Sequence, residues 1–285
     1  MSKDYLEESM EPGRIIHLTG ELDGLGIDLI TKLIHEGLEV TLQEEHLDRI
    51  SNILRLELTH LSAGVKLFDS STISHKDLLV HLSPNLAIGD LVEEIASSCP
   101  SIVVATGLNH DINPFRFSDT VINLHDLIPS VDSDNFRSNN LDSILESCHQ
   151  DQQERNLSGL PVRYWWLSQQ DAIAGLVGIV KCTSLPKGII AMCGRREWSV
   201  FDTCDQLNML YQRTLAGVSG HFSSDHLKQS PVIGAGVKPV GQITASKRPD
   251  LSQLHEVMLE SNEGGWRPLV PLRTSLMYYL AAKLD

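Results

Sequence analysis

The sequence predicts an α/β fold, a Rossmann-like doubly wound parallel sheet with a smaller C-terminal α/β substrate lobe. Three observations predict it. A glycine-rich turn near the N-terminus joins a strand-length apolar run to a helical apolar pattern, five more strand-length runs follow by residue 124, and helical spacing recurs between them. Acidic residues 1–12 predict a flexible lead-in, residues 13–130 the nucleotide-binding domain, and residues 131–285 the substrate lobe, with segments that return to the sheet.

The opening βαβ unit is the clearest part of the pattern. Apolar residues of its first strand and first helix are Ile15, Ile16, Leu18, Ile27, Leu29, Ile30, Leu33 and Ile34. Gly37 ends the helix, and residues 38–42 predict the second strand. The later elements that apolar spacing predicts are a helix over 43–61, strands over 65–68 and 77–85, a helix through 88–95, strands over 101–106 and 120–124, a helix over 139–148, a strand entering a helix over 163–180, and a helix over 201–215 capped by Ser199.

Composition narrows the classes of partner. The net charge is −14 and the pI about 5.2, so polyanions are repelled and we expect no nucleic acid and no membrane as partner. No apolar run reaches bilayer length, and the N-terminus has no signal-peptide pattern, which predicts a cytoplasmic protein.

Cysteine and histidine spacing argues against disulfides and metal sites. The five cysteines are scattered and odd in number, which favours reduced, buried thiols. The twelve histidines form no His-x-x-x-His or His-Glu-x-x-His pair, so we expect no metal.

The glycine-rich turn resembles the Thr-Gly-x-x-Gly-x-x-Gly phrase of the extended short-chain dehydrogenase/reductases, in their nucleotide-sugar branch. Thr19, Gly20 and Gly26 match it, Asp23 replaces the middle glycine, and Gly24 is a shifted substitute. The resemblance implies NAD as cofactor, but a carboxylate at the position of Asp23 opposes a pyrophosphate, so binding is expected to be weak or absent. The alternative is a βα turn that binds nothing.

The end of the second strand carries Gln43, Glu44 and Glu45. A carboxylate there binds the adenosine ribose in dinucleotide folds, so Glu44 favours NAD over NADP. A solvated helix start is the alternative interpretation.

Several downstream phrases extend the resemblance to residues 13–285. They are the strand-and-helix segment 163–180, the segment 187–200, Lys-Arg-Pro-Asp at 247–250, which resembles the family's Arg-Pro-x-Asp, and Gly-Trp-x-Pro-x-x-x-Leu-x-x-x-Leu at 265–276. The resemblance implies that Arg163 and Arg248 grip the diphosphate of a nucleotide sugar, and the alternative is that both form salt bridges. Trp165 and Trp166 are interpreted as core more than as a stacking platform, and residues 195–197 as a solvated turn.

One family feature is missing. The family's fifth strand ends in a Ser or Thr, here Thr106, and a loop and a helix with Tyr-x-x-x-Lys follow, needing roughly 25 to 35 residues. Only residues 107–119 lie between Thr106 and the next strand, and no such pair occurs there. Elsewhere, Tyr279 and Lys283 have the right spacing but lie in the last helix, and we interpret that match as chance. The Thr106 hydroxyl is a candidate substrate contact or is satisfied by a loop backbone.

Three functional hypotheses remain open. The favoured one is a non-catalytic relative, a pseudoenzyme acting as a regulatory or scaffolding subunit in nucleotide-sugar metabolism, beside an active paralogue or another protein. The second is an active NAD-dependent enzyme whose acid or base is His110, Asp111, His125 or Asp126, near the strand ends. The third is a non-redox hydrolase or lyase that uses the cleft without a dinucleotide.

Overall fold

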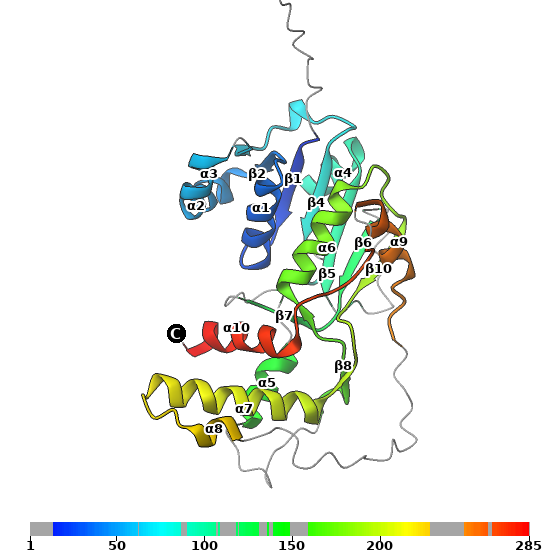
Figure 1. The fold of residues 1–285 in the computed structure, drawn as a ribbon. Helices are drawn as coiled ribbons and strands as arrows, with labels where there is room; N and C mark the ends of the chain where they lie inside the picture. Colours follow the sequence, from blue (N-terminus) through cyan, green and yellow to red (C-terminus); the bar gives the residue numbers. More distant parts are fainter. Residues whose placement is uncertain are drawn as a thin grey trace, which may run out of the picture.

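One parallel sheet forms the centre of the molecule, which confirms the predicted fold class. The computed structural model describes residues 14–61, 63–86, 90–106, 108, 118, 120–130, 136, 139–148, 159–228, 248–261 and 264–284. Its largest sheet has seven parallel strands in the order β10-β6-β5-β4-β1-β2-β3 (Figure 1). The strands are β1 (Ile16–Gly20), β2 (Val40–Leu42), β3 (Val65–Leu67), β4 (Leu78–Leu82), β5 (Ser101–Thr106), β6 (Thr120–Leu124) and β10 (Gly188–Met192). The strand order reverses between β1 and β4, as in doubly wound folds.

Helices cover both faces of this sheet. α1 (Leu25–His35) and α6 (Gln169–Lys181) lie side by side on one face, and α9 (Ser252–Ser261) packs against α6 and β10 (Figure 1). α4 (Asp90–Ser98) packs on the opposite face, where its Val92 and Ile95 meet Leu79 of β4. The predicted helix over 43–61 is wrong in one respect, because Leu54 leaves helical geometry (φ −93°, ψ 18°) and separates α2 (Glu44–Ile53) from α3 (Arg55–His60).

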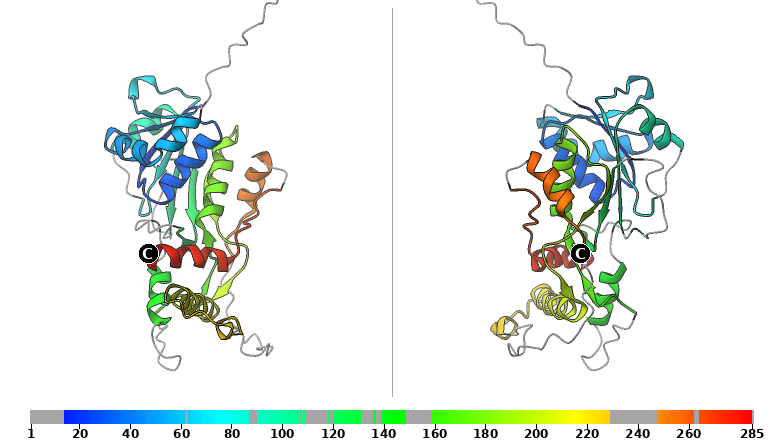
Figure 2. Two further views of the ribbon diagram at one scale, coloured as in Figure 1. Left: turned by 60° about the vertical axis from the view of Figure 1, so that its left-hand side comes forward. Right: turned by 90° about the vertical axis from the view of Figure 1, so that its right-hand side faces the viewer.

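A second layer lies beyond the carboxyl ends of the strands. α5 (Asn139–Cys148), α7 (Val200–Val218) and α10 (Leu272–Leu284) pack together there, and Figures 1 and 2 show them below the sheet. β8 (Arg163–Tyr164) pairs with β11 (Trp198–Ser199), and β7 (Leu127–Ile128) with β9 (Leu167–Ser168). Two further short helices within the described ranges are η1 (Ser70–Thr72) and α8 (Ser224–Lys228). The Ser199 cap is confirmed, since its hydroxyl accepts the Asp202 amide at 3.0 Å.

Alternation along the strands divides the core between the two faces. Ile102 and Val104 of β5, with Ile122 and Leu124 of β6, are buried in the cluster that contains the inner faces of α1 and α6. Successive side chains of a strand point to opposite faces of the sheet. Since helices cover both faces of this parallel sheet, apolar side chains occupy consecutive positions of these strands. None of the helices in the described ranges combines the length and hydropathy needed to span a bilayer.

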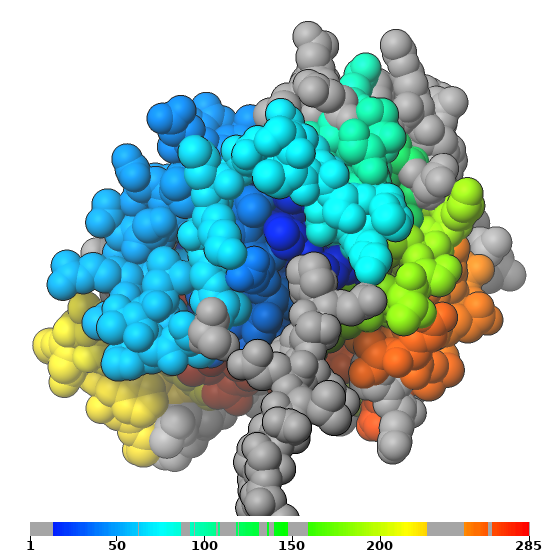
Figure 3. Space-filling model, turned by 90° about the horizontal axis from the view of Figure 1, so that it is seen from above, coloured from blue at the N-terminus to red at the C-terminus, as the bar shows by residue number. Residues whose placement is uncertain are grey.

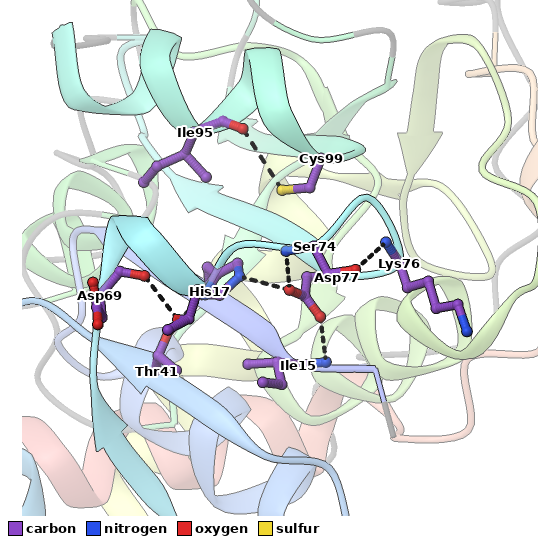
Figure 4. Close-up of polar contacts among 10 residues, drawn as sticks. Ile15, His17, Thr41, Asp69, Ser74, Lys76, Asp77, Ile95 and Cys99 are labelled. Atoms are coloured by element: carbon purple, nitrogen blue, oxygen red, sulfur yellow. Dashed lines mark hydrogen bonds and ion pairs between the residues drawn. The ribbon is translucent and has the colours of Figure 1, made fainter. Parts of the chain in front are cut away.

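A cluster of buried polar residues lies at the amino ends of β1, β2 and β4. His17 on β1 and Asp77, just before β4, point toward one another with 3.6 Å between Nε2 and Oδ2 (Figure 4). Asp77 also accepts the amides of Ile15 (3.2 Å) and Ser74 (2.7 Å), and His17 Nδ1 lies 2.7 Å from the Thr41 hydroxyl. Burial lowers the pKa of His17, and Asp77 opposes the shift. Seen from above, the cyan chain segment that leads into β4 lies beside the dark blue start of β1 (Figure 3). Sequence spacing gave no sign of this cluster.

The turn after β1 depends on one close approach between backbones. Gly20 has φ +90°, and a Cβ there would lie 2.2 Å from the Leu82 carbonyl oxygen of β4. The same oxygen accepts the Glu21 amide at 2.8 Å, so it is held in place by a hydrogen bond. Only glycine satisfies both the left-handed backbone and the contact.

We expect Gly20→Ala to lower the free energy of unfolding by about 3 kcal/mol, because it combines backbone strain with a collision against backbone. Gly37→Ala is the matched control, since Gly37 also has a positive φ (+79°) but no atom within 4 Å of an added Cβ. It should cost about 1 kcal/mol. Urea unfolding followed by tryptophan fluorescence measures both variants, and equal losses would contradict the argument.

Candidate functional site at the carboxyl edge of the sheet

The carboxyl ends of β1, β4, β5 and β6 face the second layer, and most of the predicted site residues lie along this edge (Figure 1). Thr19 is near the end of β1, Thr106 ends β5, and His125 and Asp126 follow β6. In doubly wound folds the ligand crevice lies at this edge, near the point where the strand order reverses. His110 and Asp111 lie outside the described residues.

The backbone of the glycine-rich turn has the shape expected of a dinucleotide fold. The buried Thr19 hydroxyl lies 2.9 Å from His81 Nδ1 on β4, which fixes the end of β1 against its neighbour. Gly24, with φ 35°, is the N-cap of α1, and the Gly26 amide donates to the Asp23 carbonyl at 2.7 Å. A Cβ on Gly26 would lie 3.1 Å from the Glu21 carbonyl oxygen, so the helix starts in close contact with the turn.

The charge around this turn does not suit a pyrophosphate. Asp23 forms an ion pair with Arg49 of α2, and Glu21 is exposed beside it. Asp28, in the first turn of α1, accepts a hydrogen bond from the Gln169 side chain at 2.6 Å. Carboxylates are favourable near a helix N-terminus, and they occupy the place where an anionic ligand would be stabilised. The turn therefore combines the glycines and helix start expected of a dinucleotide fold with several carboxylates.

Glu44 is the first residue of α2 and its side chain is exposed, one residue beyond Gln43 and two beyond the end of β2. This is the strand end at which a ribose-binding carboxylate lies in dinucleotide folds. The exposed start of a helix is equally a favourable place for a carboxylate, because the helix dipole is positive there. The placement is compatible with both interpretations.

Thr106 is hydrogen-bonded to the loop after β4. Its amide and its hydroxyl both donate to the Pro84 carbonyl, at 3.3 and 3.5 Å. A ligand that took this hydroxyl would have to replace the long bond to Pro84.

His125 is a partly buried imidazole whose orientation can be assigned from its neighbours. The Leu108 amide donates to Asn123 Oδ1 at 3.4 Å, which turns the Asn123 amide nitrogen toward His125 Nε2 at 3.3 Å. Nε2 is then the acceptor and Nδ1 carries the proton. Burial lowers the pKa of His125, so the ring is neutral at neutral pH and could accept a proton.

Asp126 is held in a strained conformation between the sheet and the second layer. Its φ is +46°, in the left-handed region, and its carboxylate accepts the Trp165 amide at 2.6 Å. Its carbonyl accepts the Leu167 amide at 3.2 Å. Burial raises the pKa of Asp126, while the Trp165 amide opposes the shift. The geometry gives Asp126 a structural task, namely joining the chain after β6 to β8 and β9.

The two predicted diphosphate arginines are in different states. Arg163 on β8 forms an ion pair with Glu197, so the interpretation of residues 195–197 as a solvated turn is wrong for Glu197. Arg248 is exposed, lies over the Trp165 ring at 5.3 Å, and makes a long bond of 3.5 Å to the Arg195 carbonyl. An anionic ligand would compete with Glu197 for Arg163, whereas no ion pair of Arg248 is found among the residues that the structure describes.

The tryptophan pair divides in the same way. Trp166 is buried, stacks on Tyr164 with ring centroids 4.4 Å apart, and donates to the Thr203 hydroxyl at 2.9 Å. Trp165 stays partly exposed beneath Arg248. The expected position in the core therefore applies to Trp166 and not to Trp165.

Comparison with known proteins gives a result at the level of fold. No family model matches the sequence, and no curated protein does. UDP-glucuronic acid 4-epimerase from Bacillus cereus, solved with UDP-glucuronic acid and NAD, is 13% identical with a TM-score of 0.52, over 95% of this chain and 100% of that chain. dTDP-glucose 4,6-dehydratase from Bacillus anthracis, solved with NAD, is 10% identical with a TM-score of 0.51, over 95% and 97%. Vestitone reductase from alfalfa is 12% identical with a TM-score of 0.51, over 95% and 98%.

The chain has the fold of the extended short-chain dehydrogenase/reductases. This agrees with the fold expected from the glycine-rich turn and the C-terminal motif. At these identities the likeness concerns architecture, and the chemistry must be argued from the side chains.

Two tyrosines of the described ranges, Tyr164 and Tyr279, belong to the core of the second layer. Tyr164 is fully buried in the second-layer core, and burial raises its pKa. Tyr279 donates to Asp142 at 2.6 Å, and Lys283 lies 3.6 Å from the same carboxylate. Tyr279 and Lys283 thus both contact Asp142 of α5 and link α10 to that helix. Their four-residue spacing places both side chains on the face of α10 that contacts α5.

We expect Asp126→Ala to lower the free energy of unfolding by about 2 kcal/mol, because it leaves the Trp165 amide without its acceptor and places alanine in a left-handed conformation. Asp126→Asn is the matched control. Its carbonyl can accept the same amide, and asparagine tolerates that backbone, so the cost should stay below about 1 kcal/mol. Chemical unfolding measures both, and a loss of equal size in Asp126→Asn would show that the negative charge matters instead.

Proposed function

We propose that this chain is a non-catalytic relative of the nucleotide-sugar epimerases and dehydratases, and acts as a regulatory or scaffolding subunit beside an active paralogue or another protein. One observation carries the proposal. The thirteen residues between β5 and β6, Gly107 to Asp119, contain neither tyrosine nor lysine. In the family that the sequence resembles, this connection supplies the proton-transfer pair.

The cofactor side supports the same conclusion. Two of the neighbours by fold were solved as complexes with NAD, so a dinucleotide is the ligand to test first. In this chain Asp23 occupies the middle-glycine position and Glu21 and Asp28 add negative charge around the start of α1. Because like charges repel across a few ångströms, we expect NAD to bind weakly or not at all.

The ligand side keeps features that suit a nucleotide sugar. The Bacillus cereus neighbour was solved in complex with UDP-glucuronic acid. Arg248 is exposed and stacked over an aromatic ring, a geometry in which a guanidinium presents its donors to an anion. A regulatory subunit of this type would bind the nucleotide sugar and report its concentration to a partner, without converting it.

A second candidate rests on His125. A neutral imidazole at the carboxyl edge of the sheet, oriented by Asn123, has the properties of a general base. If NAD binds tightly after all, His125 is the residue on which an active enzyme would depend.

The charge argument predicts the effect of restoring the glycine. We expect Asp23→Gly to strengthen NAD binding at least about tenfold over the wild type, because it removes a carboxylate and a Cβ from the cofactor path. Asp23→Ala removes the charge and keeps the Cβ, so it separates the two causes. Calorimetric titration with NAD, NADH, NADP and NADPH measures the affinities, after any co-purified dinucleotide has been removed. Micromolar binding of NAD by the wild type would contradict the proposal.

The absence of the catalytic pair predicts no turnover. UDP-glucose and UDP-glucuronic acid, incubated with the protein with and without NAD, should remain unchanged by mass spectrometry and proton NMR. Conversion that needs NAD and is lost in His125→Ala would select the active enzyme. Consumption of the sugar nucleotide without NAD would select a hydrolase or lyase.

A further inference from the structure

The two edges of the seven-stranded sheet differ in how they are protected. β3 forms one edge and β10 the other, with α9 packed beside β10 (Figure 1). Soluble proteins keep edge strands from pairing with other chains by making them short or by placing charged residues, especially lysine, on them. β3 has three residues, and its central Lys66 forms an ion pair with Glu39 at 2.8 Å. This edge therefore carries two of the usual protections.

β10 has neither of these protections. It has five residues, and its sequence, Gly-Ile-Ile-Ala-Met, contains no charged residue and no proline. Ile189 stands in register with Val121 of β6, which in turn pairs with Val103 of β5. Its side chain lies on the face of the sheet opposite to the buried Ile190 and is 46% exposed. The edge therefore presents a β-branched apolar side chain to solvent.

The backbone of β10 leaves hydrogen-bonding groups along this edge. In a parallel ladder, alternate residues turn their N–H and C=O toward the neighbouring strand. The Met192 carbonyl accepts the His125 amide at 2.9 Å, so Met192 and Ile190 face β6. Ile189 and Ala191 therefore turn their N–H and C=O outward, and no backbone bond to these groups is found in the part of the chain that the structure describes. Two donors and two acceptors are left for another chain.

We propose that the β10 edge binds an extended apolar segment of another protein, which adds to the seven strands of the sheet. The outward groups identify this kind of occupant, since an extended backbone offers donors and acceptors at the matching spacing. A second copy of this chain is disfavoured, because two chains of net charge −14 repel one another. The inference rests on the proposed function in one respect, because a scaffolding subunit requires a surface for its partner.

The test is amide hydrogen exchange of the full chain, followed by NMR, with and without a synthetic peptide. In this peptide, valine and threonine alternate over about eight residues between a terminal lysine and a terminal glutamate. We expect the amides of Ile189 and Ala191 to gain protection at peptide concentrations below about 1 mM, because a few net hydrogen bonds with apolar contact give an affinity of that order. The amides of β3 should not change.

Two pairs of variants separate pairing at this edge from unspecific adhesion of the peptide. Ala191→Pro removes an outward N–H without breaking the ladder to β6, and Ile189→Lys places a charge on the edge. Each should weaken peptide binding at least about tenfold. Leu67→Pro and Leu67→Lys on β3 are the matched controls. Leu67 also faces outward, because the Phe68 amide bonds to the Leu42 carbonyl, and its side chain is 52% exposed. Both controls should bind the peptide like the wild type.

Four results would overturn the proposal. They are no protection of the β10 amides up to about 1 mM peptide, equal protection at β3, equal losses in the control variants, and a wild-type dimer in sedimentation that Ile189→Lys dissociates. The last would assign the edge to a second copy of this chain. Thermal unfolding of each variant confirms that a loss of binding is not a loss of fold, and Ile189→Lys tests the edge even where Ala191→Pro does not fold. Since neither NAD nor a nucleotide sugar enters the experiment, failure here is distinguishable from failure of the proposed function.

Discussion

The contact between Gly20 and the Leu82 carbonyl is the constraint on which the site depends. It sets the backbone of β1 against that of β4 at the point where the chain must leave the sheet. The turn that follows starts α1 at once, with Gly26 close to the Glu21 carbonyl, so the helix N-terminus lies at the carboxyl edge. The N-terminus of α1 therefore supplies positive potential at this edge, where a ligand of the fold would lie.

Charge then divides the molecule into two regions of opposite character. At the turn, the positive helix end meets Glu21 and Asp23, and the nearest cation from α2 is already paired with Asp23. In a hollow beside α9, Arg195 and Arg267 are unpaired within the described ranges. Within the described residues, carboxylates therefore gather where the fold would place a dinucleotide, and arginines gather beside α9. The sign of the local charge, more than the fold, decides where a phosphate can bind.

Much of the fold could be predicted from the sequence, because its signals are local. Apolar runs mark the strands, and Ser199 three residues before Asp202 marks the start of α7. The site was less predictable, since its decisive pairs join residues far apart in the chain. Arg163 with Glu197 is one such pair, and spacing gives no sign of which arginine a carboxylate will neutralise. The left-handed backbone of Asp126 was equally hidden, because its hydrogen-bond partners Trp165 and Leu167 lie far along the chain.

The missing proton-transfer pair is compatible with an intact sheet for a physical reason. β5 and β6 are held by their ladder and by side chains such as Val104 and Ile122, which pack toward α1 and α6. A parallel pair needs a crossover of about a dozen residues, and the thirteen between Thr106 and Thr120 meet that need. The helix that would carry the chemistry is therefore not required to close the α1 and α6 side of the core. Fold and catalysis depend on different residues here, so a chain can keep the first without the second.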